Sequence, residues 1–315
     1  MEVNKVVYGN STIIDLTSDT VTPSTILSGY TAHDKAGSLI TGNYVPVEDR
    51  FDKRVVGRFN SASYFYSESS VPGMNSVTIN AGAFMATEIS YVEIPYCTEI
   101  HELAFANTGT IKSVSLPECS YIGYSAFFNC ANLSFANFPK VTVFQFGSSS
   151  TGLYSPRTFQ NCIRMSYASF PEAIMVPAFG FLNCSSLASA YFPKAKSIYT
   201  TAFGSCKNLK NCDFTEVELI QSNAFNGCSS LQMLSFPHAT TIAMQAFRSC
   251  FLLTSFYLMG SSIPTLVSTA FMSTPIGGYS AKAGQYGSIF VPASLAESYK
   301  AAAGWSYFSS RIVGI

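Results

Sequence analysis

The spacing of one series of cysteines constrains the fold of this chain more than any other feature. The series is Cys130, Cys162, Cys184, Cys206, Cys228 and Cys250. Neighbours are 22 residues apart, except for a first interval of 32, which is one period plus a ten-residue insertion, Ser148–Arg157. A unit of 22 residues cannot bury its own apolar side, so successive units must stack and share a core. The sequence therefore predicts a repeat solenoid.

A longer motif accompanies the cysteines, (A/G/T)-F-x-x-C-x-x-L-x-x-x-x-F-P-x-x-x-x-I-x-x-x. Its Leu and Ile positions are occupied by apolar side chains, as core positions should be. Proline lacks an N–H donor and ends a strand, so each repeat is expected to form one short strand and one turn. The first aromatic position holds Phe in all nine repeats: Phe84, Phe105, Phe127, Phe159, Phe181, Phe203, Phe225, Phe247 and Phe271.

This motif resembles the BspA-like class of bacterial leucine-rich repeats over Ala83 to Thr274. The resemblance implies a leucine-rich-repeat solenoid of short parallel strands joined by turns or short helical segments, with capped ends. We expect about nine coils over residues 83–275. Residues 276–315 break the period and are predicted to form a C-terminal cap, with Ser294 and Glu297 as the capping box of a helix that covers the last coil.

The first fifty residues differ in kind. Thr22 as N-cap, Pro23 and Gly29 predict a short helical turn, and a hairpin is expected around Asp34 to Gly37. We interpret residues 1–50 as a small α+β attachment module and residues 51–82 as a connecting region. The segment Ile26 to Gly42 resembles a module at the start of tail-fibre proteins from phages and prophages of Gram-positive gut bacteria. This resemblance implies a phage tail component as a partner.

Composition excludes several classes of function. Eighteen Lys plus Arg balance eighteen Asp plus Glu, so no net charge favours nucleic acid or an anionic membrane surface. Every apolar run is too short to span a membrane, so no membrane insertion is expected. Met1 to Leu16 lacks the pattern of a secretory signal peptide.

The repeated cysteines allow three interpretations. They can be small apolar core side chains, disulfide partners or metal ligands. In-register Cβ vectors of neighbouring coils run parallel, which disfavours disulfides, and no ligand set converges as a metal requires. We therefore expect reduced core thiols. Cys97 and Cys119, which share another position, and Cys212 are interpreted as core or strand residues.

No catalytic, metal or cofactor site is predicted. The chain has only three histidines, His33, His101 and His238, and none is paired with a nucleophile in the sequence. Gly147–Gly152 lacks the spacing of a nucleophile elbow or a phosphate loop. The acidic residues at 48, 49 and 52 lack the glycine and further carboxylates of a calcium loop.

The residues that vary between repeats are the candidates for recognition. Strand residues alternate between the two sides of a sheet, so the residues flanking each buried strand centre should point outward. Tyr, Phe and Met mixed with Ser and Asn are typical of adaptable binding surfaces. The alternative is that these aromatic residues pack against one another across neighbouring strands. The predicted ligand-binding residues are Phe135, Asn137, Tyr167, Tyr191, Asn211, Asp213, Met233 and Tyr257.

These patterns favour a non-catalytic binding protein. If the N-terminal resemblance holds, it is a receptor-binding component of a phage or prophage tail, located in the virion, that recognises a protein or glycan of the bacterial host surface. The alternative is a BspA-like adhesin, on the bacterial surface or secreted, that binds a protein or glycan of an animal host. Self-association into a homo-oligomer is left open, and an enzyme would need a convergent polar pocket.

Overall fold

The computed structural model describes residues 77–94, 96–145, 156–279 and 286–315, together with the backbone of five earlier strands. These strands are β1 (Lys5–Tyr8), β2 (Ser11–Asp15), β3 (Thr31–His33), β4 (Leu39–Thr41) and β5 (Tyr66–Glu68). The chain divides into two compact units, Met1–Arg54 and Val55–Ile315. The finer domain boundaries expected from the sequence stay predictions.

The first unit contains two antiparallel strand pairs. Strand β1 pairs with β2, and β3 pairs with β4 with Thr31 opposite Thr41. The second pair confirms the hairpin predicted around Asp34 to Gly37. The predicted helical turn from Thr22 to Gly29 lies outside the described residues.

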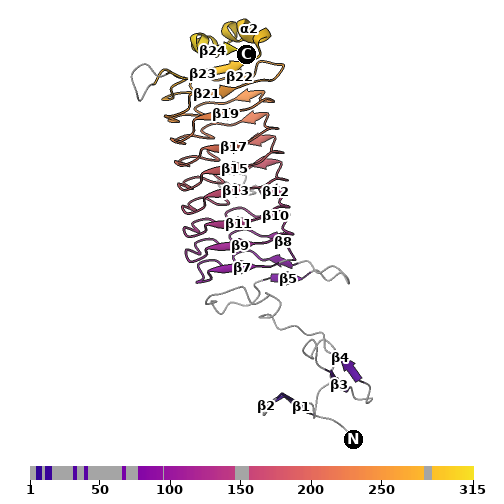
Figure 1. Ribbon diagram of the computed structural model, residues 1–315. Helices are drawn as coiled ribbons and strands as arrows, with labels where there is room; N and C mark the ends of the chain where they lie inside the picture. The colour runs from indigo at the N-terminus through magenta and orange to yellow at the C-terminus, as the bar shows by residue number, and fades with distance from the viewer. Residues whose placement is uncertain are drawn as a thin grey trace, which may run out of the picture. The chain divides into compact units, whose positions relative to one another are not determined.

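The second unit is the solenoid, and each coil contributes two strands rather than the one predicted. In Figure 1 they form two columns of arrows on opposite sides of the stack. We call the strands that contain the Ile position of the motif the back strands and those of the other column the front strands. The second strand exists because the Ile position is buried beside its equivalent in the next coil, as at Ile198 and Ile220. The front strands are β7 (Tyr91–Glu93), β9 (Ser113–Ser115), β11 (Phe135–Asn137), β13 (Tyr167–Ser169), β15 (Ser189–Tyr191), β17 (Asn211–Asp213), β19 (Met233–Ser235) and β21 (Ser255–Tyr257).

Each back strand pairs in parallel with at least one neighbouring back strand, and β5 covers the edge of β6 in antiparallel fashion. Both ladders of hydrogen-bonded strands are interrupted at the same coil boundary, between β11 and β13 and between β12 and β14, and the front ladder is interrupted again between β17 and β19. The interruption coincides with the predicted insert Ser148–Arg157, most of which lies outside the described residues. The back strands are β6 (Val77–Ile79), β8 (Cys97–Ile100), β10 (Tyr121–Ile122), β12 (Val143–Phe144), β14 (Met175–Val176), β16 (Ser197–Ile198), β18 (Leu219–Ile220), β20 (Thr241–Ile242) and β22 (Thr265–Leu266).

A column of stacked phenylalanine rings fills the core. From Phe84 to Phe271, each ring centroid lies 4.9–5.5 Å from the next and the planes are nearly parallel. This distance is close to the spacing of neighbouring strands, about 4.8 Å, so stacking rings and pairing strands impose the same rise per coil. The predicted core position is confirmed at every repeat, because all nine rings are buried.

The turn after each Phe contains a residue in the left-handed conformation. Four consecutive repeats place Asn there, with φ between 59° and 64°. Asn tolerates this conformation better than most L-residues. The amides also form a ladder, because Asn129 Nδ2 donates to Asn107 Oδ1 at 2.9 Å and Asn183 Nδ2 donates to Asn161 Oδ1 at 3.0 Å. Asn161 Nδ2 joins the two pairs by donating to Asn129 Oδ1 at 2.6 Å.

The C-terminal segment both extends and covers the stack. Strand β23 (Ser288–Val291) pairs in parallel with β21, and β24 (Ile312–Gly314) pairs in parallel with β23. Between them lie two 3₁₀ segments, η2 (Ala293–Leu295) and η3 (Ser306–Arg311), and the helix α2 (Ala296–Ala301). The segment was expected only to break the period, whereas β23 continues the front strands.

The predicted capping box is wrong, although the helix is present. Ser294 lies inside η2, and α2 begins after Leu295 without a side-chain cap. The chain enters a 3₁₀ turn directly after Pro292, which places the helix start two residues beyond the serine.

Aromatic side chains of the cap seal the end of the core. Trp305 and Tyr299 are buried, and Trp305 Nε1 donates to the Pro264 carbonyl at 2.7 Å. Phe308 packs edge-on against Phe271 at 5.4 Å and so ends the phenylalanine column.

Candidate functional site

Parallel in-register pairing within three successive sheets arranges the outward residues of the front strands in two lines, which are interrupted between β11 and β13 and between β17 and β19. The first residue of each strand lies beside the first residue of the next, as in the run Tyr167, Ser189 and Asn211. The third residues form the second line, which contains Ser169, Tyr191 and Asp213. We call the surface formed by these two lines the front face. All eight ligand-binding residues predicted from the sequence lie on it, on strands β11 to β21.

Several large side chains of the front face are exposed. The exposed fraction is 55% for Phe135, 51% for Tyr167, 38% for Tyr191 and 57% for Met233. Residues between the two lines, such as Val114 and Ala190, are buried, although Ala136 and Cys212 are only half-buried. Within the described part of the chain, the rings of Phe135, Tyr167 and Tyr191 have no aromatic partner. Cross-strand packing of aromatic residues therefore does not account for these three.

Tyr257 behaves differently from the other predicted aromatic residues. Its ring stacks on that of Phe290 with centroids 4.6 Å apart and an interplanar angle of 16°. Here the alternative interpretation, packing between neighbouring strands, is correct. Phe290 is the third of the four residues of β23 and lies directly beside Tyr257 of β21. This stack therefore covers the C-terminal end of the front face.

The polar residues of the front face are partly engaged with one another. Asn137 Nδ2 donates to Ser115 Oγ at 3.2 Å, and Asn211 Nδ2 donates to Ser189 Oγ at 3.4 Å. Asp213 Oδ1 accepts hydrogen bonds from the backbone N–H and the hydroxyl of Thr215. These contacts hold the polar groups in place while each amide and carboxylate keeps further hydrogen-bonding capacity.

The sequence analysis missed Tyr91, Glu93 and Phe290 on this face. Tyr91 is 50% exposed and lies directly beside Ser113. The first repeat is one residue short, so counting forward from its Phe shifts the strand. Counting four residues back from Pro95 or Pro292 gives Tyr91 and Ser288, the first residues of β7 and β23, so the proline is the signal that locates these two strands.

The six repeated cysteines belong to the core. Each Sγ donates to the carbonyl oxygen of the Phe in the preceding coil at 3.0–3.2 Å. All nine cysteines are free in the structure. Burial raises the pKa of the Cys130 and Cys184 thiols to about 12. Such thiols are poor nucleophiles, which agrees with the core interpretation.

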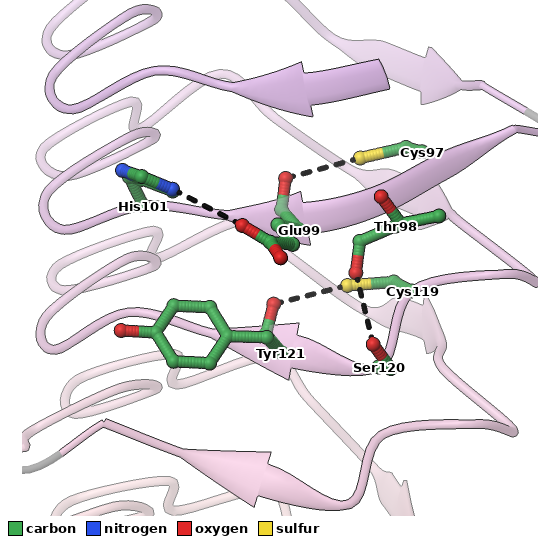
Figure 2. A network of polar contacts seen from close by, with 7 residues as sticks. All are labelled: Cys97, Thr98, Glu99, His101, Cys119, Ser120 and Tyr121. Carbon is green, nitrogen blue, oxygen red and sulfur yellow. Dashed lines mark hydrogen bonds and ion pairs between the residues drawn. The ribbon is translucent and has the colours of Figure 1, made fainter. Parts of the chain in front are cut away.

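Figure 2 shows His101 beside its acidic partner, Glu99. His101 Nε2 lies 3.4 Å from Glu99 Oε2, and the nearby Cys97 Sγ donates to the Glu99 carbonyl at 3.4 Å. The pKa of the Cys119 thiol is raised, mainly by a hydrogen bond with the Cys97 thiol and to a smaller extent by burial. A catalytic cysteine needs a lowered pKa and access to substrate. The pKa of the Cys119 thiol is shifted in the opposite direction, and both thiols are buried away from any substrate.

Among the residues that the structure describes, no three His, Cys, Asp or Glu side chains come together in a way that could hold a metal ion. No helix in this part of the chain is long and apolar enough to cross a membrane.

The stacked coils, the two strand lines and the buried Phe and Leu positions define a leucine-rich-repeat solenoid with an open strand face. The BspA type Leucine rich repeat region matches residues 69–150 and 154–276 in six copies, and this chain belongs to that family. No catalytic family is indicated, and no curated protein matches the chain.

Several solved structures are similar to this chain. A leucine-rich repeat protein of T. pallidum (TpLRR) has 17% identity and a TM-score of 0.42, with 72% of this chain and 92% of that chain covered. A leucine-rich repeat protein from Bacteroides ovatus has 14% identity and a TM-score of 0.33, covering 83% and 98% of the two chains. A leucine rich cell surface protein from Faecalibacterium prausnitzii has 15% identity and a TM-score of 0.35, covering 84% and 87%.

Proposed function

We propose that this chain is a non-catalytic binding protein and that the front face is its recognition surface. The observation that carries the proposal is the exposure of Phe135, Tyr167 and Tyr191 on one face without aromatic partners among the described residues. Exposed aromatic side chains contribute a large share of binding energy at interfaces, and the Ser and Asn residues between them supply complementarity. Membership of a leucine-rich-repeat family supports a binding role.

The test is attachment of the purified chain to whole cells of Gram-positive gut bacteria. Replacing Phe135, Tyr167 and Tyr191 together by Ser should abolish attachment, because the exposed aromatic anchors of the surface are lost. A matched control replaces Val143, Ile174 and Met244 by Ser. These three side chains are exposed but do not belong to the front strands.

Circular dichroism and the melting temperature must show that both variants fold. Wild-type attachment by the folded aromatic variant, or equal loss in the control, would remove the front face as the recognition surface. Attachment should then be sought at the insert Ser148–Arg157.

Two candidate functions differ in where the chain is located and in what it binds. In the first, the N-terminal module joins a phage or prophage tail and the solenoid recognises the bacterial host; the resemblance of Ile26 to Gly42 is its support. In the second, the chain is a bacterial surface or secreted adhesin for host protein or glycan, which the BspA-type family supports.

Immunogold electron microscopy with antibody against the repeats distinguishes the two settings. Gold particles on phage tails after prophage induction support the first, and gold particles on uninduced cell surfaces support the second. Light scattering of the full chain tests for self-association.

A further inference from the structure

Three cations lie just before the central front strands. Arg164 precedes β13 by three residues, and Lys207 and Lys210 precede β17. All three are exposed, and none forms an ion pair with another described residue. Lysines that follow the front strands are instead paired with carboxylates of neighbouring coils: Lys140 with Glu118, Lys194 with Glu172, and Lys196 with Glu216 and Glu218. Three cations without an ion pair among the described residues therefore lie at the starts of β13 and β17, and Lys112, which is also exposed, directly precedes β9.

These cations adjoin the exposed aromatic residues of the same strands. Lys210 is directly followed by Asn211, which lies in one line with Ser189 and Tyr167. Arg164 and Lys207 are two coils apart, a separation of roughly 10 Å at the usual strand spacing. Cationic groups, two tyrosine rings and hydroxyl and amide groups thus occupy one surface across three coils.

We propose that this patch, consisting of Arg164, Tyr167, Tyr191, Lys207, Lys210 and Asn211, binds an anionic polysaccharide. The inference rests on the proposed binding function and specifies its ligand class. Tyrosine rings stack on the apolar faces of sugar rings, and a guanidinium binds a carboxylate or sulfate through two parallel hydrogen bonds.

The arrangement favours a sugar polymer over an acidic protein. Charge attraction alone would recognise an acidic protein and would not require exposed tyrosine faces between the cations. The one acidic residue on β13 to β17, Asp213, is the last residue of β17 and lies directly beside Tyr191, at the other end of the strand from Lys210. Its Oδ1 accepts two hydrogen bonds from Thr215, which holds the carboxylate at that end.

Biolayer interferometry of the full chain against four polymers tests the proposal. Polygalacturonate carries carboxylates, dextran sulfate carries sulfates, dextran is neutral, and poly-L-glutamate carries charge without sugar. We expect binding to one or both anionic polysaccharides and none to dextran, with affinity that falls as salt is added. Preference between the two anionic polymers identifies the anionic group.

Replacing Arg164, Lys207 and Lys210 together by Ala should weaken this binding by about tenfold or more, because charge-assisted hydrogen bonds are lost. Replacing Tyr167 and Tyr191 by Ser should also weaken it. The matched control removes the same net charge from the ion-paired Lys140, Lys194 and Lys300, and should change affinity by no more than about twofold.

Three outcomes would overturn the proposal. Equal losses in both lysine-containing variants would mean that net charge alone matters. Equal binding of poly-L-glutamate, unaffected by the tyrosine substitutions, would mean that no sugar is recognised. Absence of binding to every polymer, while the chain still attaches to cells through its front face, would refute the ligand class and leave the proposed function intact. Failure of the wild-type chain to attach to cells would instead refute the proposed function.

Discussion

At the scale of single residues, the chain uses each repeated side chain for one purpose. Phenylalanine rings fill the space between coils, thiols occupy a small buried gap and donate to a carbonyl, and asparagines sit in left-handed turns. Because each role recurs in coil after coil, a single substitution disturbs two interfaces, one on each side of its coil.

Phe203→Ala should lower the free energy of unfolding by about 3–5 kcal/mol, because the ring packs between Phe181 and Phe225 and leaves a cavity. Tyr191→Ala, on the same stretch of coils but exposed, should cost less than about 1 kcal/mol. Urea denaturation followed by circular dichroism measures both. Equal losses would mean that the buried and exposed positions of the coils are wrongly assigned.

The buried thiols should make stability depend on alkaline pH. A free thiol has a pKa of about 8.5 in an unfolded chain, whereas burial raises the pKa of Cys184 to about 12. The folded state therefore keeps a proton that the unfolded state releases. The stabilising contribution of the thiol is full below pH 8.5 and is lost as pH rises toward 12.

Urea denaturation under reducing conditions between pH 7 and pH 10 tests this dependence. Cys184→Ala should be less stable at pH 7, yet its stability should fall less steeply above pH 8.5, by about 1.4 kcal/mol per pH unit at most. Comparison with wild type cancels the titration of lysines and tyrosines. Parallel stability curves for the two proteins would contradict the buried, protonated thiol.

At the scale of elements, the C-terminal cap shows how a solenoid ends. Strand β23 continues the front strands, and β24 pairs with β23. The side chains of Trp305 and Tyr299 are buried and cover the end of the core. An uncovered last coil would expose its apolar core to water, so the cap should carry a measurable part of the stability of the second unit.

Trp305→Ala should cost about 3–5 kcal/mol of unfolding free energy, since a buried indole and its contact with Tyr299 are removed. Trp305→Phe should cost about 1–3 kcal/mol, because the Pro264 carbonyl loses its donor. Ser294→Ala serves as the control and should change stability by less than about 0.5 kcal/mol. A larger loss of stability in Ser294→Ala would mean that Ser294 does cap the helix, as the sequence predicted.

At the scale of the second unit, the coils behave as nearly interchangeable layers. Each coil contacts its neighbours through stacked rings and paired strands, so stability is approximately a sum over coils and interfaces. Removing a whole period should therefore shorten the stack without changing its register.

Deletion of residues 202–223 joins Thr201 to Ala224 and should bring Phe225 against Phe181. We expect a folded chain with a lower melting temperature. Deletion of residues 202–212 removes half a period, misaligns every later core position and should prevent folding of the second unit. Circular dichroism and size-exclusion chromatography of both variants give the comparison, and two equally folded products would refute the layered register.

The sequence by itself determined the period, the identity of the core positions and the outward direction of residues such as Tyr167 and Tyr191. It could do so because a 22-residue unit has one way to bury its apolar residues, and repetition compares the positions within a single chain. The family resemblance of the repeats, too, was carried by these positions. The position of the eight candidate residues on the front face could be predicted from the sequence. Their role in binding is a proposal.

Only the tertiary structure decided which contacts these residues make. The second strand of each coil depends on pairing between coils, which no two-residue segment such as Tyr121–Ile122 predicts alone. The stack of Tyr257 on Phe290 joins residues from the repeats and the cap, and the pairing of Lys194 with Glu172 spans two coils. Whether an outward aromatic ring or a lysine is covered or free depends on its neighbours in space, and these come from other coils.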